Sequence, residues 1–391
     1  MEANSNIIFL NIPGFPHLYS AYSVKCSLMG KTLTEATATV YFINNAPFFA
    51  YDSPQKNMPQ GKVEGINYLY TCGTSHKNKS RIINWYLRIK GLYKEYVFLW
   101  KHAKKNTTLI IAYCPFLLLL AYKILCMLRG IHLVLSIMEL HIAMEKRPLR
   151  KKINDRLFDR YAFMVTDKVI VISDYLKNYI HQLYPQKKIY KIPVLADASL
   201  FDAVTVKDTE KYFLFCGNAY YASIIEFIVS AFEKLQTTEY KLVLICQGTS
   251  QQMQALKEKL KQSPSYAHIA LYSHLPYEEL IRYYKKSFAL LIPLRPSIQD
   301  TARFPQKIAE YLASGRPVIT TNVGEIKNYL SDGMNAFIAH DYDSYAFAEK
   351  MQQALDNPQQ AHSIGLNGRK VFDRFFDYRL YGQSLLEFLS S

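Results

Sequence analysis

The sequence lacks several patterns that identify common enzyme classes. It contains no GxGxxG and no GxxxxGK[ST] segment, which removes the usual dinucleotide-binding and P-loop interpretations. It also lacks a GxSxG segment, which weakens an esterase interpretation. Its six cysteines form no CxxC pair and no His/Cys ligand spacing, so we expect neither a disulfide framework nor a zinc site. With only 15 Gly and 16 Pro among 391 residues, the chain is neither disordered nor fibrous.

A secretory signal and a membrane span are also not expected. No Lys or Arg precedes the first apolar run, residues 7–12, which excludes an ordinary secretory signal. Residues 109–128 are almost wholly apolar and have the length of a spanning helix, but Pro115 and Lys123 interrupt them. We therefore predict a strand over 109–113, a turn, and a helix over 116–129 that ends at Gly130.

Positive charge is confined to the first half of the chain. Residues 1–195 hold 27 Lys and Arg against 11 Asp and Glu, whereas the remainder holds 20 against 21. The excess concentrates in 77–105 and 146–160, and in the first segment Trp85, Tyr86 and Tyr93 interleave with the cations, as do Tyr96 and Trp100. Such a helix suits anionic lipid head groups. The alternative is a solvated helix whose aromatic residues pack on a sheet. No nucleic-acid partner is expected, because no nucleic-acid-binding motif accompanies the charge.

Strand-like and helix-like runs alternate along the whole chain, which is typical of parallel sheets covered on both faces. The pattern predicts an α/β fold of two facing, doubly wound, Rossmann-like domains with helices at the C-terminus, and ligands at the carboxyl ends of the strands. The expected parts are a first domain over 1–195, a linker over 196–210, a second domain over 211–374, and a helix over 375–391 that packs back toward the first domain. The expected strands are 7–11, 39–43, 66–70, 109–113, 132–137, 168–172 and 189–193, then 212–216, 241–246, 269–272, 289–292, 317–320 and 336–338.

Residues 304–319 are the most distinctive segment, and they predict a loop, a short helix and a buried strand. Pro305 suits the first helical turn and Gly315 the position past the helix end. The start of this helix should lie at the carboxyl edge of the sheet, where an anion is favoured. Lys307 and Glu310 share one helix face, so Lys could hold a diphosphate and Glu could accept hydrogen bonds from ribose hydroxyls. The alternative is an ordinary surface ion pair.

This segment resembles the donor-binding region of the retaining glycosyltransferases of family four, which have the two-domain GT-B architecture. Residues 169–176, 192–201 and 213–217 are similar to the family's last strand and helix of the first domain, its linker, and the first donor-domain strand. The resemblance implies a donor site. Its expected residues are Gly14, Gly217, Asn218, Arg303, Gln306, Lys307 and Glu310.

The sequence departs from the family at several positions. Members commonly carry two Glu eight positions apart, but here Ala302 stands in place of the first. The Arg and Lys that often follow the donor-strand Gly are replaced by residues 218–221, so Lys307 and Arg303 are the expected diphosphate cations. Pro305 stands where the family usually has Gly. In the first domain, Met138 occupies the place of a family His, while Glu139 is kept and His141 is the expected substitute; these two are the candidate catalytic residues.

The resemblance implies transfer of a sugar, with retention, from a nucleotide diphosphate donor to a lipid-linked or glycan acceptor in cell-surface polysaccharide synthesis. The implied site is an interdomain cleft, the protein is peripheral on the inner face of the cytoplasmic membrane, and no cofactor is needed. Two alternatives stay open: a nucleotide-sugar 2-epimerase of the same architecture, and a catalytically silent scaffold.

A metal is not expected. Asp341, Tyr342 and Asp343 spell a DxD, which in another glycosyltransferase architecture binds a divalent ion. Here the triplet follows a strand and precedes a helix, so we predict that Asp343 is a helix cap.

Overall fold

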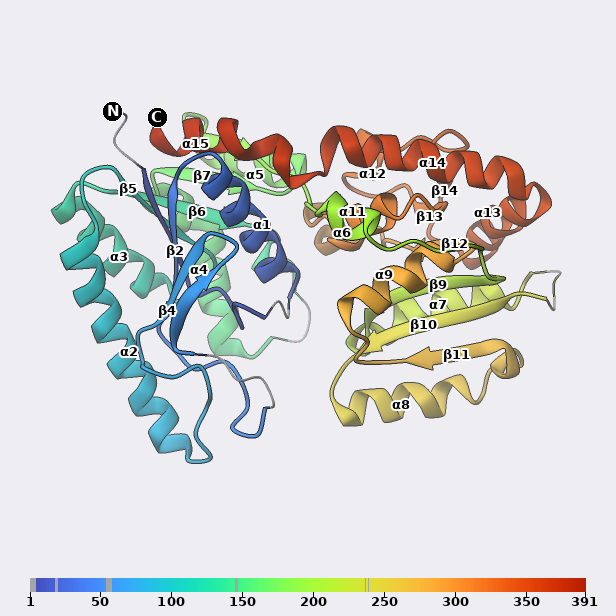
Figure 1. Cartoon of the computed structure of the whole chain (residues 1–391), viewed down its shortest axis with the longest axis horizontal. Helices are drawn as coiled ribbons and strands as arrows, with labels where there is room; N and C mark the ends of the chain where they lie inside the picture. Colours follow the sequence, from blue (N-terminus) through green and yellow to red (C-terminus); the bar gives the residue numbers. More distant parts are fainter. Residues whose placement is uncertain (1–4, 18–19, 54–57, 145–146, 236, 238) are drawn as a thin grey trace. The chain divides into compact units, whose positions relative to one another are not determined.

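The structure is a computed structural model that describes residues 5–17, 20–53, 58–144, 147–235, 237 and 239–391. The chain divides into two compact units (Figure 1). Unit 1 comprises residues 1–195 and 378–391, and unit 2 comprises residues 196–377. Both are α/β units built on a parallel sheet, as the sequence predicts.

The sheet of unit 1 has the strand order β3-β4-β2-β1-β5-β6-β7-β8. Neighbouring strands are parallel except β3 and β4, which are antiparallel. Apolar residues of the central strands are fully buried because helices cover the sheet on both faces (Figure 1). The strands are β1 (Asn6–Leu10), β2 (Thr39–Asn44), β3 (Gln60–Val63), β4 (Ile66–Tyr70), β5 (Thr107–Ile111), β6 (His132–Ile137), β7 (Lys168–Val171) and β8 (Lys188–Lys191).

The end of the chain is part of unit 1. The Tyr378 hydroxyl donates to Glu35 over 2.9 Å, and Lys168 Nζ donates to the carbonyls of Phe388 and Leu389 over 2.7 and 3.0 Å. Gly382 allows a close approach to helix α1 (Ala21–Glu35), since a Cβ there would lie 2.8 Å from the Thr32 carbonyl oxygen. The helices of this unit are α1 (Ala21–Glu35), α2 (Arg81–His102), α3 (Phe116–Arg129), α4 (Leu149–Val165), α5 (Asp174–Leu183) and α15 (Gly382–Ser390), with short turns η1 (His141–Ala143) and η4 (Tyr378–Tyr381).

The sheet of unit 2 is parallel, with the strand order β11-β10-β9-β12-β13-β14. Its strands are β9 (Tyr212–Asn218), β10 (Lys241–Gln247), β11 (Ile269–Tyr272), β12 (Ala289–Ile292), β13 (Val318–Thr321) and β14 (Phe337–Ala339). Its helices are α6 (Ala198–Asp202), α7 (Ala222–Phe232), α8 (Ser250–Leu260), α9 (Tyr277–Lys286), α10 (Ile298–Ala302), α11 (Lys307–Ala313), α12 (Ile326–Tyr329), α13 (Ser344–Asp356) and α14 (Pro358–Phe375), with turns η2 (Ala219–Tyr221) and η3 (Tyr266–His268).

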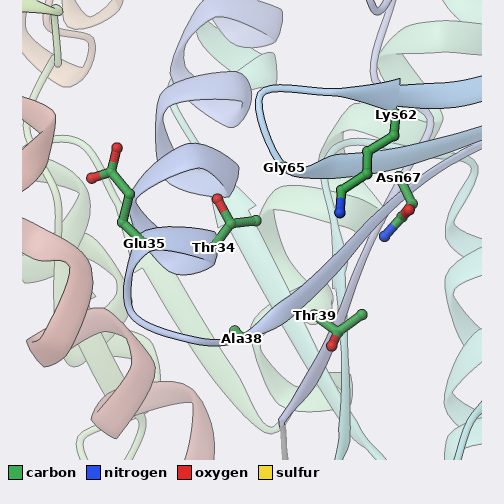
Figure 2. Close-up of a pocket in the computed structure, with 7 residues that line it drawn as sticks. All are labelled: Thr34, Glu35, Ala38, Thr39, Lys62, Gly65 and Asn67. Atoms are coloured by element: carbon green, nitrogen blue, oxygen red, sulfur yellow. The ribbon is translucent and has the colours of Figure 1, made fainter.

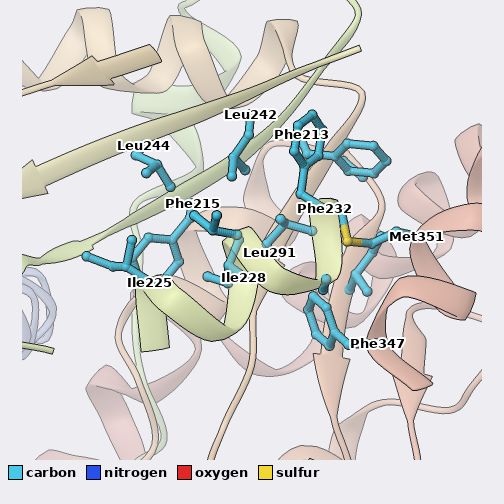
Figure 3. Packing of buried hydrophobic residues seen from close by; sticks show 14 of the residues in the cluster. Phe213, Phe215, Ile225, Ile228, Phe232, Leu242, Leu244, Leu291, Phe347 and Met351 are labelled. Carbon is cyan, nitrogen blue, oxygen red and sulfur yellow. The ribbon is translucent and has the colours of Figure 1, made fainter. Parts of the chain in front are cut away.

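Large apolar residues fill the core of unit 2 between the sheet and α7. Figure 3 shows Phe213 and Phe215 of β9 beside Ile225 and Ile228 of α7, and Met351 of α13 joins the same cluster. At about 25 cal/mol per Å² of buried apolar surface, such side chains supply most of the stabilisation of a unit this size. The strands that carry the candidate site are thus held by a packed core.

The predicted strands are confirmed within two residues at each end, and the helix over 116–129 is confirmed with Gly130 left-handed at its end (φ 63°). Strand β3 was not predicted, because its four residues are all exposed and carry no alternation of apolar side chains. The predicted C-terminal helix over 375–391 is wrong in its first part, where a 3₁₀ turn over Tyr378–Tyr381 precedes α15.

Two further expectations differ from the structure. Residues 196–210, expected to be a linker, lie in unit 2; α6 forms there, Phe201 is buried, and its carbonyl accepts a hydrogen bond from Lys285 over 2.9 Å. Pro305 does not lie in the first turn of the short helix. That helix, α11, begins at Lys307, with Gln306 as the flanking residue.

Candidate functional site

The strand order of unit 2 creates a switch point between β9 and β12. The chain runs from β9 to β10 and β11 on one side, then crosses to β12, β13 and β14 on the other. In open α/β sheets, ligands bind outside the carboxyl ends of the strands at such a point. Gly217 and Asn218 are the last two residues of β9, and the segment that follows β12 contains Arg295, Arg303 and α11.

Lys307 and Glu310 form a buried ion pair next to this switch point. Lys307 Nζ lies 2.8 Å from Glu310 Oε2, and the Tyr284 hydroxyl donates to the same oxygen over 3.2 Å. Glu310 is only 3% exposed. Burial disfavours the charged form of Lys307, but the neighbouring Cys216 thiol and Glu310 carboxylate outweigh that effect and raise its pKa. The alternative of an ordinary surface pair is therefore wrong.

The second oxygen of Glu310 remains available. Among the described residues, none makes a hydrogen bond to Oε1, and this oxygen is not one of the fully enclosed atoms that lack a partner, so it keeps some access to solvent. The two tyrosines beside Glu310 hold each other in place. The Tyr311 hydroxyl accepts a hydrogen bond from the Cys216 backbone N–H over 2.8 Å, and the Tyr311 ring packs edge-on against the Tyr284 ring. Glu310 thus offers one acceptor to a ligand while Lys307 and Tyr284 hold the other.

A second cluster of charge lies around Asp300, which is 0% exposed. Arg295 contacts it through its backbone N and through Nε, each over 2.9 Å, and Arg303 Nη2 lies 2.6 Å from its other oxygen. Arg303 also donates to the Tyr221 hydroxyl over 3.2 Å, and both guanidinium groups lie over the Tyr221 ring. The sequence indicated only Arg303 of this cluster.

The remaining predicted donor residues are distributed as follows. Gly217 is the last but one residue of β9, and a Cβ there would lie 2.5 Å from the Phe215 ring. Asn218 ends β9 and accepts the Tyr220 N–H over 2.8 Å as the cap of η2. Gln306 is buried at the start of α11. Gly14 lies in unit 1, in the loop after β1, with a left-handed φ of 73°. Of the predicted donor residues, Arg303, Gln306, Lys307 and Glu310 therefore lie together in the segment that follows β12, at the switch point of unit 2.

The candidate catalytic residues lie after β6 of unit 1. His141 is buried, and its Nδ1 lies 2.8 Å from Asp159 Oδ1, while Asp159 Oδ2 accepts the Ile142 N–H over 2.8 Å. The Tyr113 ring stacks on the imidazole with 4.1 Å between centroids. A carboxylate accepts hydrogen bonds, so this contact is made by an Nδ1–H donor of the imidazole, and it orients the ring. Glu139 is half-buried in the same loop. No sequence pattern indicated Asp159 or Tyr113.

Helix α2 presents aromatic and basic side chains to solvent, and we call this the α2 surface: Ile82, Trp85, Tyr86, Ile89, Tyr93 and Trp100 with Arg88, Lys90, Lys94 and Lys101. Trp85 and Tyr93 are 67% and 70% exposed, so the alternative of aromatic residues packed on the sheet is wrong for them. Helix α3, which contacts α2 through the stacked rings of Tyr96 and Tyr122, also exposes the apolar side chains of Leu117 and Met127. Within the described ranges, no helix has the length and apolarity needed to cross a membrane.

Asp343 is the cap of α13, as predicted, because its carboxylate accepts the N–H groups of Tyr345 and Ala346 over 2.9 Å each. Among the residues that the structure describes, no group of three His, Cys, Asp or Glu side chains is placed to hold a metal. A pocket of about 330 Å³ in unit 1 lies at the amino ends of the strands, opposite to the candidate residues (Figure 2). Its lining includes exposed Glu35 and Lys62 and indicates no specific ligand.

Comparison with known proteins supports the resemblance to glycosyltransferases that the sequence indicates. Residues 197–371, slightly less than half of the chain, match the family described as glycosyl transferases group 1. The chain is 22% identical over 227 residues to an uncharacterized glycosyltransferase of Methanocaldococcus jannaschii, covering 58% of this chain and 60% of that protein. The matched part thus spans about three fifths of that relative.

Solved structures share the fold over nearly the full length. Sucrose-phosphate synthase from Thermosynechococcus elongatus superposes with a TM-score of 0.79 at 16% identity, covering 98% of each chain. Anabaena HepE, solved with UDP-glucose, superposes with a TM-score of 0.70 at 13% identity, covering 99% of this chain and 100% of that one. The predicted GT-B architecture and the predicted resemblance to this glycosyltransferase family are confirmed.

Proposed function

We propose that the chain is a glycosyltransferase that moves a sugar from a nucleotide diphosphate donor to an acceptor hydroxyl. The observation that carries this proposal is Glu310, a buried carboxylate whose Oε2 is held by Lys307 and Tyr284 while Oε1 has no hydrogen bond from any described residue. A ribose diol supplies the donors that such an oxygen needs. The family match over residues 197–371 and the UDP-glucose bound by Anabaena HepE support this ligand class.

In this proposal, unit 2 binds the donor and catalysis is mainly electrostatic. Negative charge develops on the leaving diphosphate as the bond to the sugar breaks, and nearby cations stabilise it. No covalent nucleophile is required, since holding the acceptor hydroxyl against the sugar carbon supplies much of the rate enhancement. We propose that the sugar is transferred with retention and that no metal takes part.

Unit 1 would bind the acceptor. His141, oriented by Asp159 and Tyr113, presents a buried imidazole at the carboxyl edge of its sheet, and Glu139 lies in the same loop. The α2 surface suits anionic head groups, because Trp and Tyr favour the membrane interface and Lys and Arg the lipid charge. We therefore propose a lipid-linked glycan acceptor, a peripheral position on the inner face of the cytoplasmic membrane, and a role in cell-surface polysaccharide synthesis.

The test is to incubate the purified protein with UDP-, GDP- and ADP-sugars, with and without lipid-linked acceptors, and to analyse all products. We expect transfer with one donor when an acceptor is present and slow hydrolysis without it. An epimerised sugar nucleotide from donor alone would instead establish the 2-epimerase alternative. Absence of any turnover, with nucleotide binding intact, would favour a silent scaffold.

The role of unit 1 has its own test. His141→Ala should lower transfer at least about a hundredfold, the lower end of what a positioned acid–base group contributes, while nucleotide binding by unit 2 stays unchanged. His181→Ala on α5 is the matched control, because that His lies in the last turn of a surface helix. Equal transfer rates for the two variants would remove His141 from the mechanism.

A further inference from the structure

The Asp300 cluster joins two arginines to one buried carboxylate. Two guanidinium groups, of Arg295 and Arg303, contact the single carboxylate of Asp300. Lys307, by contrast, is matched by Glu310.

One donor in the cluster has no partner. Arg303 Nε is buried and makes no hydrogen bond to any residue in the described part of the chain, although its two terminal nitrogens contact Asp300 and Tyr221. Buried N–H groups without a partner are rare in folded proteins, and one explanation is a ligand or ion that completes the set. The side chain is 20% exposed, so the cluster is reachable from solvent.

The cluster also lies where the topology favours a ligand. Tyr221 follows β9 and Arg295 follows β12, the two strands at the switch point of unit 2. The Tyr221 ring, faced by both guanidinium groups at 5.2 and 6.0 Å, holds them side by side. Planar guanidinium groups in this arrangement match the oxygens of a phosphate better than a single ammonium does.

We infer that Arg295 and Arg303, oriented by Asp300 and Tyr221, form the diphosphate clamp of this chain. The inference rests on the proposed function and deepens it: the charge that relatives supply just after the first donor strand comes here from the segment after β12. It also replaces Lys307, whose charge is used by Glu310, with Arg295 as the second phosphate cation. Asp300 and Tyr221 are positioning residues in this clamp.

The test is calorimetric titration with uridine, guanosine and adenosine 5′-diphosphates, the matching monophosphates, and inorganic pyrophosphate. Wild type should prefer the diphosphate to the monophosphate of one base, and pyrophosphate should compete. Arg295→Ala and Arg303→Ala should each lower diphosphate affinity roughly 10- to 100-fold, the range for lost hydrogen bonds to a charged group, and monophosphate affinity much less. Arg303→Lys keeps the positive charge but loses the planar, two-pronged guanidinium group, so its diphosphate affinity should lie between those of wild type and Arg303→Ala.

The control is Arg282→Ala, since Arg282 pairs with Glu278 on the exposed face of α9 in the same unit. If Arg295 and Arg303 had a purely structural role, their alanine variants would lose thermal stability and would bind diphosphates and monophosphates more weakly by the same factor. The ratio of diphosphate affinity to monophosphate affinity therefore distinguishes the two roles. An unchanged ratio in Arg303→Lys and in both alanine variants, with wild type binding the diphosphate, would overturn the clamp and leave the proposed function standing. Failure of wild type to bind any nucleotide or pyrophosphate would overturn both.

Discussion

Lys307 Nζ lies 2.8 Å from Glu310 Oε2 across one turn of α11, and the carboxylate of this pair is almost fully buried. Removing one partner of a buried pair leaves an uncompensated charge, which typically costs about 3 to 5 kcal/mol. We therefore expect Lys307→Met to lower the free energy of unfolding by about 3 kcal/mol, measured by urea denaturation. The double variant with Glu310→Gln should recover part of that loss. If Lys307→Met alone is neutral, the pair does not contribute as described.

A second prediction concerns pH and Glu95, which faces the interior from α2. The Tyr122 hydroxyl and Asn45 Nδ2 donate to Oε1, the latter over 3.4 Å. Burial raises the pKa of Glu95 from 4.5 to about 7, although these hydrogen bonds act in the opposite direction. Its contribution to stability is therefore fully present below about pH 4.5 and is lost as pH rises through 7.

Glu95→Gln should remove this dependence. Relative to wild type, the variant should gain stability between pH 5 and pH 8, by up to about 3 kcal/mol from the linkage of a shift this size. Urea denaturation of both proteins at the two pH values measures the gain. Glu64→Gln, at an exposed position of the β3–β4 turn, is the control. A difference between wild type and Glu95→Gln that does not vary with pH would contradict this account of the buried carboxyl.

The α2 surface predicts binding to anionic vesicles. Each basic residue near such a surface contributes about 1 kcal/mol, and the binding is screened by salt. Changing Arg88, Lys94 and Lys101 to Gln should weaken sedimentation with anionic liposomes by at least tenfold, and changing Trp85 and Tyr93 to Ser should weaken it further. Tyr266→Ser, an exposed tyrosine of unit 2, should have no effect. Equal partition of wild type to neutral and anionic vesicles would show that the charge plays no part.

Asp343 allows a test of the metal-free mechanism. As the cap of α13, it should lose about 1 kcal/mol of stability on change to Ala, with the turnover of the folded enzyme unchanged. Activity should also persist in excess chelator, because cationic side chains neutralise the donor in this account. Loss of activity in chelator that magnesium or manganese restores would show that the mechanism is wrong on this point.

The sequence was sufficient for most of the elements, though not for β3 or α6, and for contacts that are local along the chain. Periodicity located the strands, and the spacing of Lys307 and Glu310 indicated a shared face, because three residues are one helical turn. It could not locate the Asp300 cluster, in which Tyr221 and Arg303 lie 82 positions apart and meet only through the sheet. The pairing of His141 with Asp159 was missed for the same reason, since η1 and α4 come together only in the folded unit.

The most direct test of the central claim, that Glu310 binds the ribose of a nucleotide donor, is calorimetric titration of wild type and Glu310→Gln with a nucleoside diphosphate and its 2′-deoxy and 3′-deoxy analogues. Wild type should bind the ribonucleotide about tenfold more tightly than either analogue, as expected for one hydrogen bond to a charged group. In Glu310→Gln this preference should shrink to about twofold or less, whatever the change in overall affinity. Equal wild-type affinity for the ribonucleotide and both deoxy analogues would contradict the claim.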